Sequence, residues 1–236
     1  MKRILLFLCL ITIAQQTWAQ KNFGKDIKEA LYIHDTSSTL ESELVALKAF
    51  RDLTKKYPKE WRGFYWLAYL NTQVGRLDGM VESYPKDLDS KQLFREAMDL
   101  YRKSYDLKKE KTDAEESDFL VLEGFIYGWF SYKLAETPEQ KAKYDQEKKA
   151  KYREALKLNP RNPLMYVMIA TVMARSEDYN DLVSAIGLFD SADRTFNEVE
   201  NRGLTTYWNK DFIGYWKSVA EKNLKKALDA KGDKDS

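Results

Sequence analysis

From residue 20 onward, apolar residues recur at spacings of three and four positions, and the strict alternation typical of β-strands is absent. This periodicity predicts an all-α chain. We expect helices over the ranges 23–34, 39–57, 61–75, 90–110, 114–135, 138–158, 163–175, 180–200 and 205–229. One polar loop, 76–89, separates two of them, and the small charged tail 231–236 is expected to fray. No Gly/Ser-rich linker divides the chain, so residues 20–230 are expected to form one helical domain.

Residues that favour helix ends occur at the expected boundaries. Three pairs have the spacing of a capping box, namely Ser38 with Glu41, Thr112 with Glu115, and Thr137 with Gln140. Pro138 and Pro163 occupy positions where a first helical turn accepts proline, and Asn162 precedes the second of them as an expected N-cap.

The N-terminus has the pattern of an export signal. Two basic residues are followed by an apolar run over 4–14, and then by small residues at Thr17 and Ala19. This pattern predicts a secretory signal peptide over 1–19 and a periplasmic or secreted mature chain. Cys9 lies inside the apolar run after large residues, which disfavours the alternative of a lipoprotein.

Composition excludes several kinds of site. One histidine and one cysteine cannot build a zinc site, an iron–sulfur cluster or a disulfide framework, so we expect no metal or cofactor. The 39 basic and 37 acidic residues give a net charge of +2. This balance does not indicate the excess of positive charge that binds nucleic acid. After the signal peptide, no apolar stretch is long enough to span a membrane.

A repeated spacing of aromatic and small residues predicts stacked helical hairpins. The aromatic residues Phe50, Tyr101, Tyr152 and Phe189 have a small residue four positions before them, three positions after them, or both. They are separated by 51, 51 and 37 residues. Small neighbours let two helices approach closely around one ring, which is how repeated hairpins stack.

The segment 154–163, Glu-Ala-Leu-Lys-Leu-Asn-Pro-Arg-Asn-Pro, resembles the end of a tetratricopeptide repeat. Three helices fit the frame of that family, through Phe64, Leu67, Ala68 and Gly75, through Leu120, Gly124 and Tyr127, and through Tyr166, Ile169, Ala170 and Met173. The resemblance covers 39–195, although its 51-residue intervals exceed the family's ~34. The layout is also similar to exported repeat proteins of Gram-negative bacteria. The resemblance implies a right-handed array of three to four hairpins with a capping C-terminal helix.

In this family the first helix of each hairpin lines a concave groove. The corresponding positions here are Arg62, Tyr65, Tyr69, Thr72, Gln73, Asp118, Val121, Phe125, Trp129, Leu164, Val167, Thr171 and Arg175. The resemblance therefore implies a non-enzymatic scaffold that binds a protein or peptide in the cell envelope. An equally weighted alternative is that the C-terminal helix fills this groove, because the 61–75 helix is apolar nearly all round.

The C-terminal helix carries a further aromatic cluster, consisting of Tyr207, Trp208, Phe212, Tyr215 and Trp216. These rings could form a stacking platform for a glycan or another small ligand. We prefer to interpret them as the apolar face of a capping helix, which helical arrays require.

Two residues deserve testing as catalytic groups, and neither has the neighbours that catalysis needs. Glu123 lies in an apolar stretch, where it is expected to pair with a Lys, Arg or Tyr of a neighbouring helix. Gly124 and Gly128 indicate that this helix closely approaches an adjacent one. His34 is expected at a helix C-terminus, where the helix dipole favours it, and no triad spacing surrounds it. We therefore expect no enzymatic activity.

Overall fold

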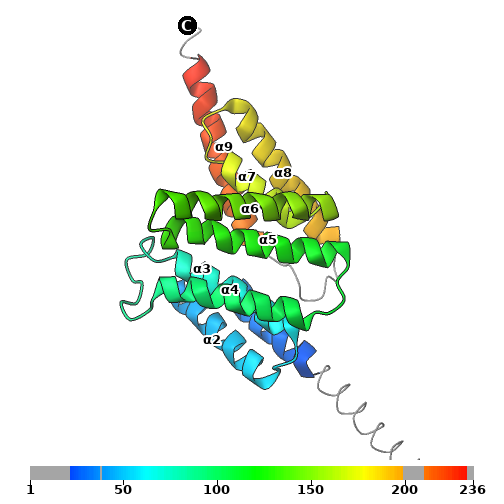
Figure 1. The fold of residues 1–236 in the computed structure, drawn as a ribbon. Coiled ribbons are helices and arrows are strands. Elements are labelled where there is room, and N and C mark those ends of the chain that lie inside the picture. The colour runs from blue at the N-terminus through cyan, green and yellow to red at the C-terminus, as the bar shows by residue number, and fades with distance from the viewer. Residues whose placement is uncertain (1–21, 38, 199–209, 233–236) are drawn as a thin grey trace, which may run out of the picture. The chain divides into compact units, whose positions relative to one another are not determined.

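The computed structural model describes residues 22–37, 39–198 and 210–232, and every regular element within them is helical. Figure 1 shows this arrangement of helices. The predicted all-α class is confirmed for the described residues. The predicted signal peptide over 1–19 lies outside them. No helix in the described part of the chain combines the length and apolarity needed to cross a bilayer.

Contacts divide the chain into two compact units, residues 1–108 (unit 1) and 109–236 (unit 2). The elements of unit 1 are a helical segment over 22–35, α2 (Leu40–Lys56), α3 (Trp61–Arg76) and α4 (Ser90–Leu107). Helix α3 contacts both α2 and α4, and every residue from Gly63 to Gly75 is buried. It is therefore the core helix of unit 1.

Small residues set the close approach of α3 and α4. The buried Ser104 hydroxyl of α4 donates a 2.8 Å hydrogen bond to the backbone carbonyl of Trp61 at the start of α3. At the other end of α3, a Cβ on Gly75 would lie 3.1 Å from the ring of Phe94. The two helices are thus joined by a hydrogen bond at one end and by a close contact at Gly75 at the other.

Unit 2 contains the remaining elements: α5 (Asp113–Trp129), the π-helix η1 (Phe130–Leu134), α6 (Pro138–Leu158), α7 (Pro163–Met173), α8 (Tyr179–Glu198) and α9 (Lys210–Gly232). Helix α5 pairs with α6, α7 with α8, and α8 with α9. Helix α9 also reaches α7, where the side-chain amide of Asn223 donates to the carbonyl oxygen of Ala174.

Most predicted helix ends are confirmed, and the exceptions are local. The capping box of Thr112 and Glu115 is present, and the side chain of Asn162 accepts a hydrogen bond from the backbone of Leu164. Helix α2 is capped by Thr39 with Ser42, one residue later than the predicted pair.

The segment predicted as one helix over 114–135 changes from α to π winding at Phe130. Two hydrogen bonds hold this turn to α6. The hydroxyl of Ser131 donates to Asp145 over 2.8 Å, and the ammonium of Lys141 donates to the Ser131 hydroxyl over 3.4 Å. Within α6, Lys141 also donates to Asp145 over 2.8 Å. The hydrogen bonds from Lys141 and then Ser131 lower the pKa of Asp145 to about 2.

The four repeated rings pack between helices as the spacing predicts. Phe50, Tyr101 and Phe189 are buried, and Tyr152 is half-buried. The ring of Tyr152 lies against α5 at Gly124, where an added Cβ would be 2.6 Å from its Cδ1 atom and closer still to Cε1. The predicted close approach at Gly124 is therefore confirmed.

Candidate functional site

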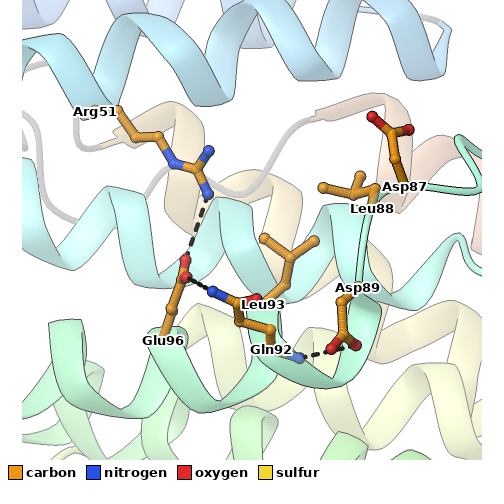
Figure 2. Close-up of a pocket in the computed structure, with 7 residues that line it drawn as sticks. All are labelled: Arg51, Asp87, Leu88, Asp89, Gln92, Leu93 and Glu96. Atoms are coloured by element: carbon orange, nitrogen blue, oxygen red, sulfur yellow. Dashed lines mark hydrogen bonds and ion pairs between the residues drawn. The ribbon is translucent and has the colours of Figure 1, made fainter.

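Unit 1 contains two adjoining surface pockets. The first, of about 310 Å³, is lined by Arg51 of α2, Leu67 and Asn71 of α3, and Glu96, Asp99, Leu100 and Lys103 of α4. The second, of about 360 Å³, is lined by Arg51, Asp87, Leu88, Asp89, Gln92, Leu93 and Glu96 (Figure 2). Because Arg51 and Glu96 line both pockets, the pockets form one groove, which we call the α2–α4 groove.

An ion pair marks the boundary between the two pockets. The guanidinium of Arg51 lies 3.3 Å from the carboxylate of Glu96, and Gln92 donates to the same carboxylate over 2.8 Å (Figure 2). The side chains of Arg51 and Glu96 are 42% and 38% exposed. An ion pair this exposed contributes little to stability, so a ligand can displace it at small cost.

Asn71 differs from its buried polar neighbours on α3. The residue is 0% exposed, and neither its side-chain nitrogen nor its side-chain oxygen has a hydrogen-bond partner among the described residues. By contrast, the Thr72 hydroxyl donates to the carbonyl of Ala68 over 2.9 Å, and Gln73 donates to the Tyr69 hydroxyl over 2.6 Å. An unsatisfied buried amide is unfavourable by about 1–3 kcal/mol. Asn71 lines the first pocket, but its amide atoms are themselves buried and are not open to a ligand there.

The charges of the two pockets differ. In the pocket of Asn71, Arg51 and Lys103 balance Glu96 and Asp99. The ammonium of Lys103 lies 4.1 Å from the ring centroid of Phe64, which keeps it beside α3.

The second pocket has three carboxylates, those of Asp87, Asp89 and Glu96, and one guanidinium, that of Arg51. The carboxylate of Asp89 also caps α4, accepting hydrogen bonds from the backbone nitrogens of Lys91 and Gln92. One end of the groove is thus close to neutral and the other favours a cation.

None of the thirteen positions that the family resemblance implies lines either pocket. Eight are buried, namely Tyr65, Tyr69, Thr72, Gln73, Asp118, Val121, Leu164 and Val167. Arg62, Phe125, Trp129 and Thr171 are half-buried, and Arg175 is exposed.

Several of these buried polar groups bond to one another. In unit 1, Arg76 donates to Gln73, which donates to Tyr69, and burial raises the pKa of that tyrosine. In unit 2, the Asn162 amide donates to Ser117 over 2.8 Å and to Asp118 over 2.9 Å. These side chains serve the packing of their own unit.

The predicted partner of Glu123 is confirmed as a base on a neighbouring helix. Lys151 of α6 lies 3.0 Å from its carboxylate. Burial lowers the pKa of Lys151, but the hydrogen bond to Glu123 and its charge outweigh burial and raise that pKa overall. Glu123 is therefore held by an ion pair within unit 2.

His34 lies in the last turn of the first described helix and is buried. Its Nδ1 atom lies 3.1 Å from the carboxylate of Glu43, and its ring packs against Trp66 and Tyr69. No group of three histidine, cysteine or acidic side chains suited to a metal ion occurs among the described residues.

The C-terminal aromatic cluster is only partly within the described residues. Tyr207, Trp208 and the side chain of Phe212 lie outside them. Tyr215 is 63% exposed, whereas the Trp216 ring is half-buried, with the guanidinium of Arg175 lying 4.5 Å from its centroid.

No family model, curated protein or solved structure matches the chain. What the α2–α4 groove can do therefore follows from its own geometry and chemistry.

Proposed function

We propose that this chain is a non-enzymatic scaffold of the bacterial cell envelope that binds a protein or peptide segment. In this proposal, cleavage after Ala19 releases a periplasmic or secreted chain. Its helical hairpins form a right-handed, tetratricopeptide-like array with α9 as a cap. The repeat-like segment 154–163 and the packing of α9 on α8 and α7 support this architecture.

The α2–α4 groove is the observation that carries the proposal. Leu67, Leu93 and Leu100 provide an apolar floor, and charged side chains of both signs surround it. Protein-binding surfaces combine an apolar centre with a polar rim in this way.

We place the contact surface in this groove and not at the thirteen positions of the resemblance. None of those thirteen lines either pocket of the groove. The glycan alternative is less well supported, because Trp216 already packs with Arg175 and is not an open stacking surface.

Selection from a random peptide library on the purified chain tests the proposal. Peptides selected on the natural sequence should bind a Leu100→Glu variant at least about tenfold more weakly, because a carboxylate then replaces part of the apolar floor. Val172→Glu, at an exposed apolar residue of unit 2, is the matched control and should leave binding unchanged. Failure to enrich any peptide, or equal losses in both variants, would refute the groove as the binding surface.

A further inference from the structure

The second pocket of the α2–α4 groove carries negative charge that the chain itself leaves unneutralised. Its three carboxylates are those of Asp87, Asp89 and Glu96, and its one cation is the guanidinium of Arg51. That guanidinium lies 3.3 Å from the carboxylate of Glu96. Figure 2 shows Asp87 and Asp89 across the pocket from this ion pair, and no cation among the described residues pairs with either of them. The pocket therefore offers two carboxylates to a bound cation.

These two carboxylates are within reach of a ligand. Both residues are exposed, and the side chain of Glu96 in the same pocket is 38% exposed. Asp89 accepts hydrogen bonds from the backbone nitrogens of Lys91 and Gln92, so the positive N-terminus of α4 offsets part of its charge. No hydrogen bond within the described part of the chain engages the carboxylate of Asp87. Asp87 is therefore the carboxylate most available to a ligand.

The first pocket favours an apolar group over a second cation. Leu100 is half-buried, so part of its side chain is open to the pocket, and Leu67 belongs to the same lining. The ammonium of Lys103 also lines this pocket and would repel a cation placed there. The carboxylate of Asp99 already lies 3.5 Å from the guanidinium of Arg102. An apolar side chain thus suits the first pocket, and a basic side chain suits the second.

On these grounds, and resting on the function proposed above, we propose that the α2–α4 groove binds a polypeptide segment with an apolar and a basic side chain on the same side. The apolar side chain packs on Leu100 in the first pocket. A Lys or Arg two residues away places its charge in the second pocket, where Asp87 is its main partner. In an extended segment, side chains two residues apart point to the same side and are separated by roughly 7 Å, which suits two adjoining pockets. Asp87 thus determines the specificity for a basic side chain.

NMR titration of the full chain tests this assignment. The probe is acetyl-Lys-Ala-Leu-Ala-Lys-amide, which has a lysine two residues to either side of its leucine and so suits either chain direction. It should shift the methyl signals of Leu100 and the backbone amide signal of Asp87 saturably. An analogue with glutamine in place of both lysines should bind about threefold to fivefold more weakly, as expected for the loss of an exposed ion pair. Added salt should weaken the binding of the lysine probe but not that of the analogue.

Asp87→Asn and Asp99→Asn form a matched pair, because each removes the charge of one exposed aspartate that lines the groove. Asp87→Asn should bind the lysine probe about threefold to fivefold more weakly. Asp99→Asn should change the affinity by less than about 1.5-fold, because that carboxylate pairs with Arg102 and lines only the first pocket. Asp89 is left unchanged because it caps α4.

Reversing the charge of Asp87 provides a test of specificity. Asp87→Lys should bind acetyl-Glu-Ala-Leu-Ala-Glu-amide more tightly than it binds the lysine probe, whereas the natural sequence should show the opposite preference. A loss of affinity caused only by a distorted groove would weaken the binding of both peptides and would not reverse their order.

The proposal is overturned if Asp87→Asn binds the lysine probe as tightly as the natural sequence, or if Asp99→Asn weakens binding equally. It is also overturned if the probe gives no saturable shift, or if the glutamine analogue binds as tightly. Hexylammonium that binds as tightly as the probe would assign the groove to a small cation with an apolar chain instead. The function proposed above is decided separately by Leu100→Glu, so library peptides that need Leu100 but bind Asp87→Asn undiminished would refute only the preference for a basic side chain.

Discussion

Gly124→Ala separates two physical effects that act in opposite directions. Alanine is the better helix former, and by this effect alone the substitution in the middle of α5 would stabilise the chain by about 1 kcal/mol. The new Cβ, however, would lie 2.6 Å from Cδ1 of Tyr152 and closer to Cε1. Carbon atoms at such a separation are far inside their optimal contact distance, so the ring or α5 has to move.

The ring of Tyr152 has little freedom to move away. Its hydroxyl lies 3.2 Å from the sulfur of Met168 on α7, and burial raises the pKa of that hydroxyl. Overpacking a core contact typically costs about 1–3 kcal/mol of stability. Because the Tyr152 ring has little freedom to move, we expect a cost near the upper end of this range. Subtracting the gain in helix propensity leaves a net destabilisation of about 2 kcal/mol, or roughly 4–8 °C in thermal midpoint.

Thermal unfolding followed by circular dichroism measures this change, with Gly187→Ala as the matched control. Gly187 is an exposed residue of α8, and a Cβ there would have no neighbour within 4 Å. That variant should therefore gain about 1 kcal/mol from helix propensity. In a Tyr152→Ala background, Gly124→Ala should become stabilising by a similar amount. A Gly124→Ala variant as stable as the natural sequence would refute the packing inferred for α5 and α6.

Three further predictions concern polar contacts of unit 2. Lys151→Met leaves Glu123, whose side chain is 12% exposed, without its ion pair and should cost about 1–3 kcal/mol in urea unfolding. Because the pKa of Lys151 is raised above 10.5, the contribution of the pair should persist at neutral pH and disappear above that value. Asp145 has a lowered pKa of about 2, so stability should be lost as pH falls from 3.8 toward 2, and Asp145→Asn should flatten this acid loss. Asn162→Asp keeps an N-cap but turns a donor to Asp118 into a second carboxylate, which should lower the thermal midpoint by several degrees at pH 7.

Each of these has a result that would contradict it. Lys149→Met, at an exposed site of the same helix, should change the free energy of unfolding by less than about 0.5 kcal/mol. If Lys149→Met destabilises the chain as much as Lys151→Met does, the ion pair of Lys151 does not cause the loss. An Asp145→Asn variant with an unchanged acid profile would mean that other carboxylates set the profile. If Asn162→Asp raises stability as pH is increased from 3 to 7, the new carboxylate has a favourable contact and not the expected repulsion.

The helices and their main contacts could be predicted because they depend on local order in the sequence. Apolar periodicity located the elements, and small–aromatic spacing identified rings such as Phe50 and Phe189 that are buried between helices. The π-turn beginning at Phe130 could not be found in this way, because its Ser131 hydroxyl donates to Asp145, which lies on a different helix. The partner of Glu123 could be predicted as a type but not as Lys151, because the rotation of α6 against α5 decides which base meets it.

The α2–α4 groove was missed because the family resemblance selects residues by their match to a repeat. On α3 it selected Tyr65 and Thr72, which are buried in unit 1. The groove is lined instead by side chains such as Arg51 of α2 and Glu96 of α4, which the resemblance does not select. These two residues are 45 positions apart in the sequence, and they meet because α2 and α4 both pack on α3. A local sequence pattern identifies each helix, but it does not show which side chains of two different helices face each other across a third.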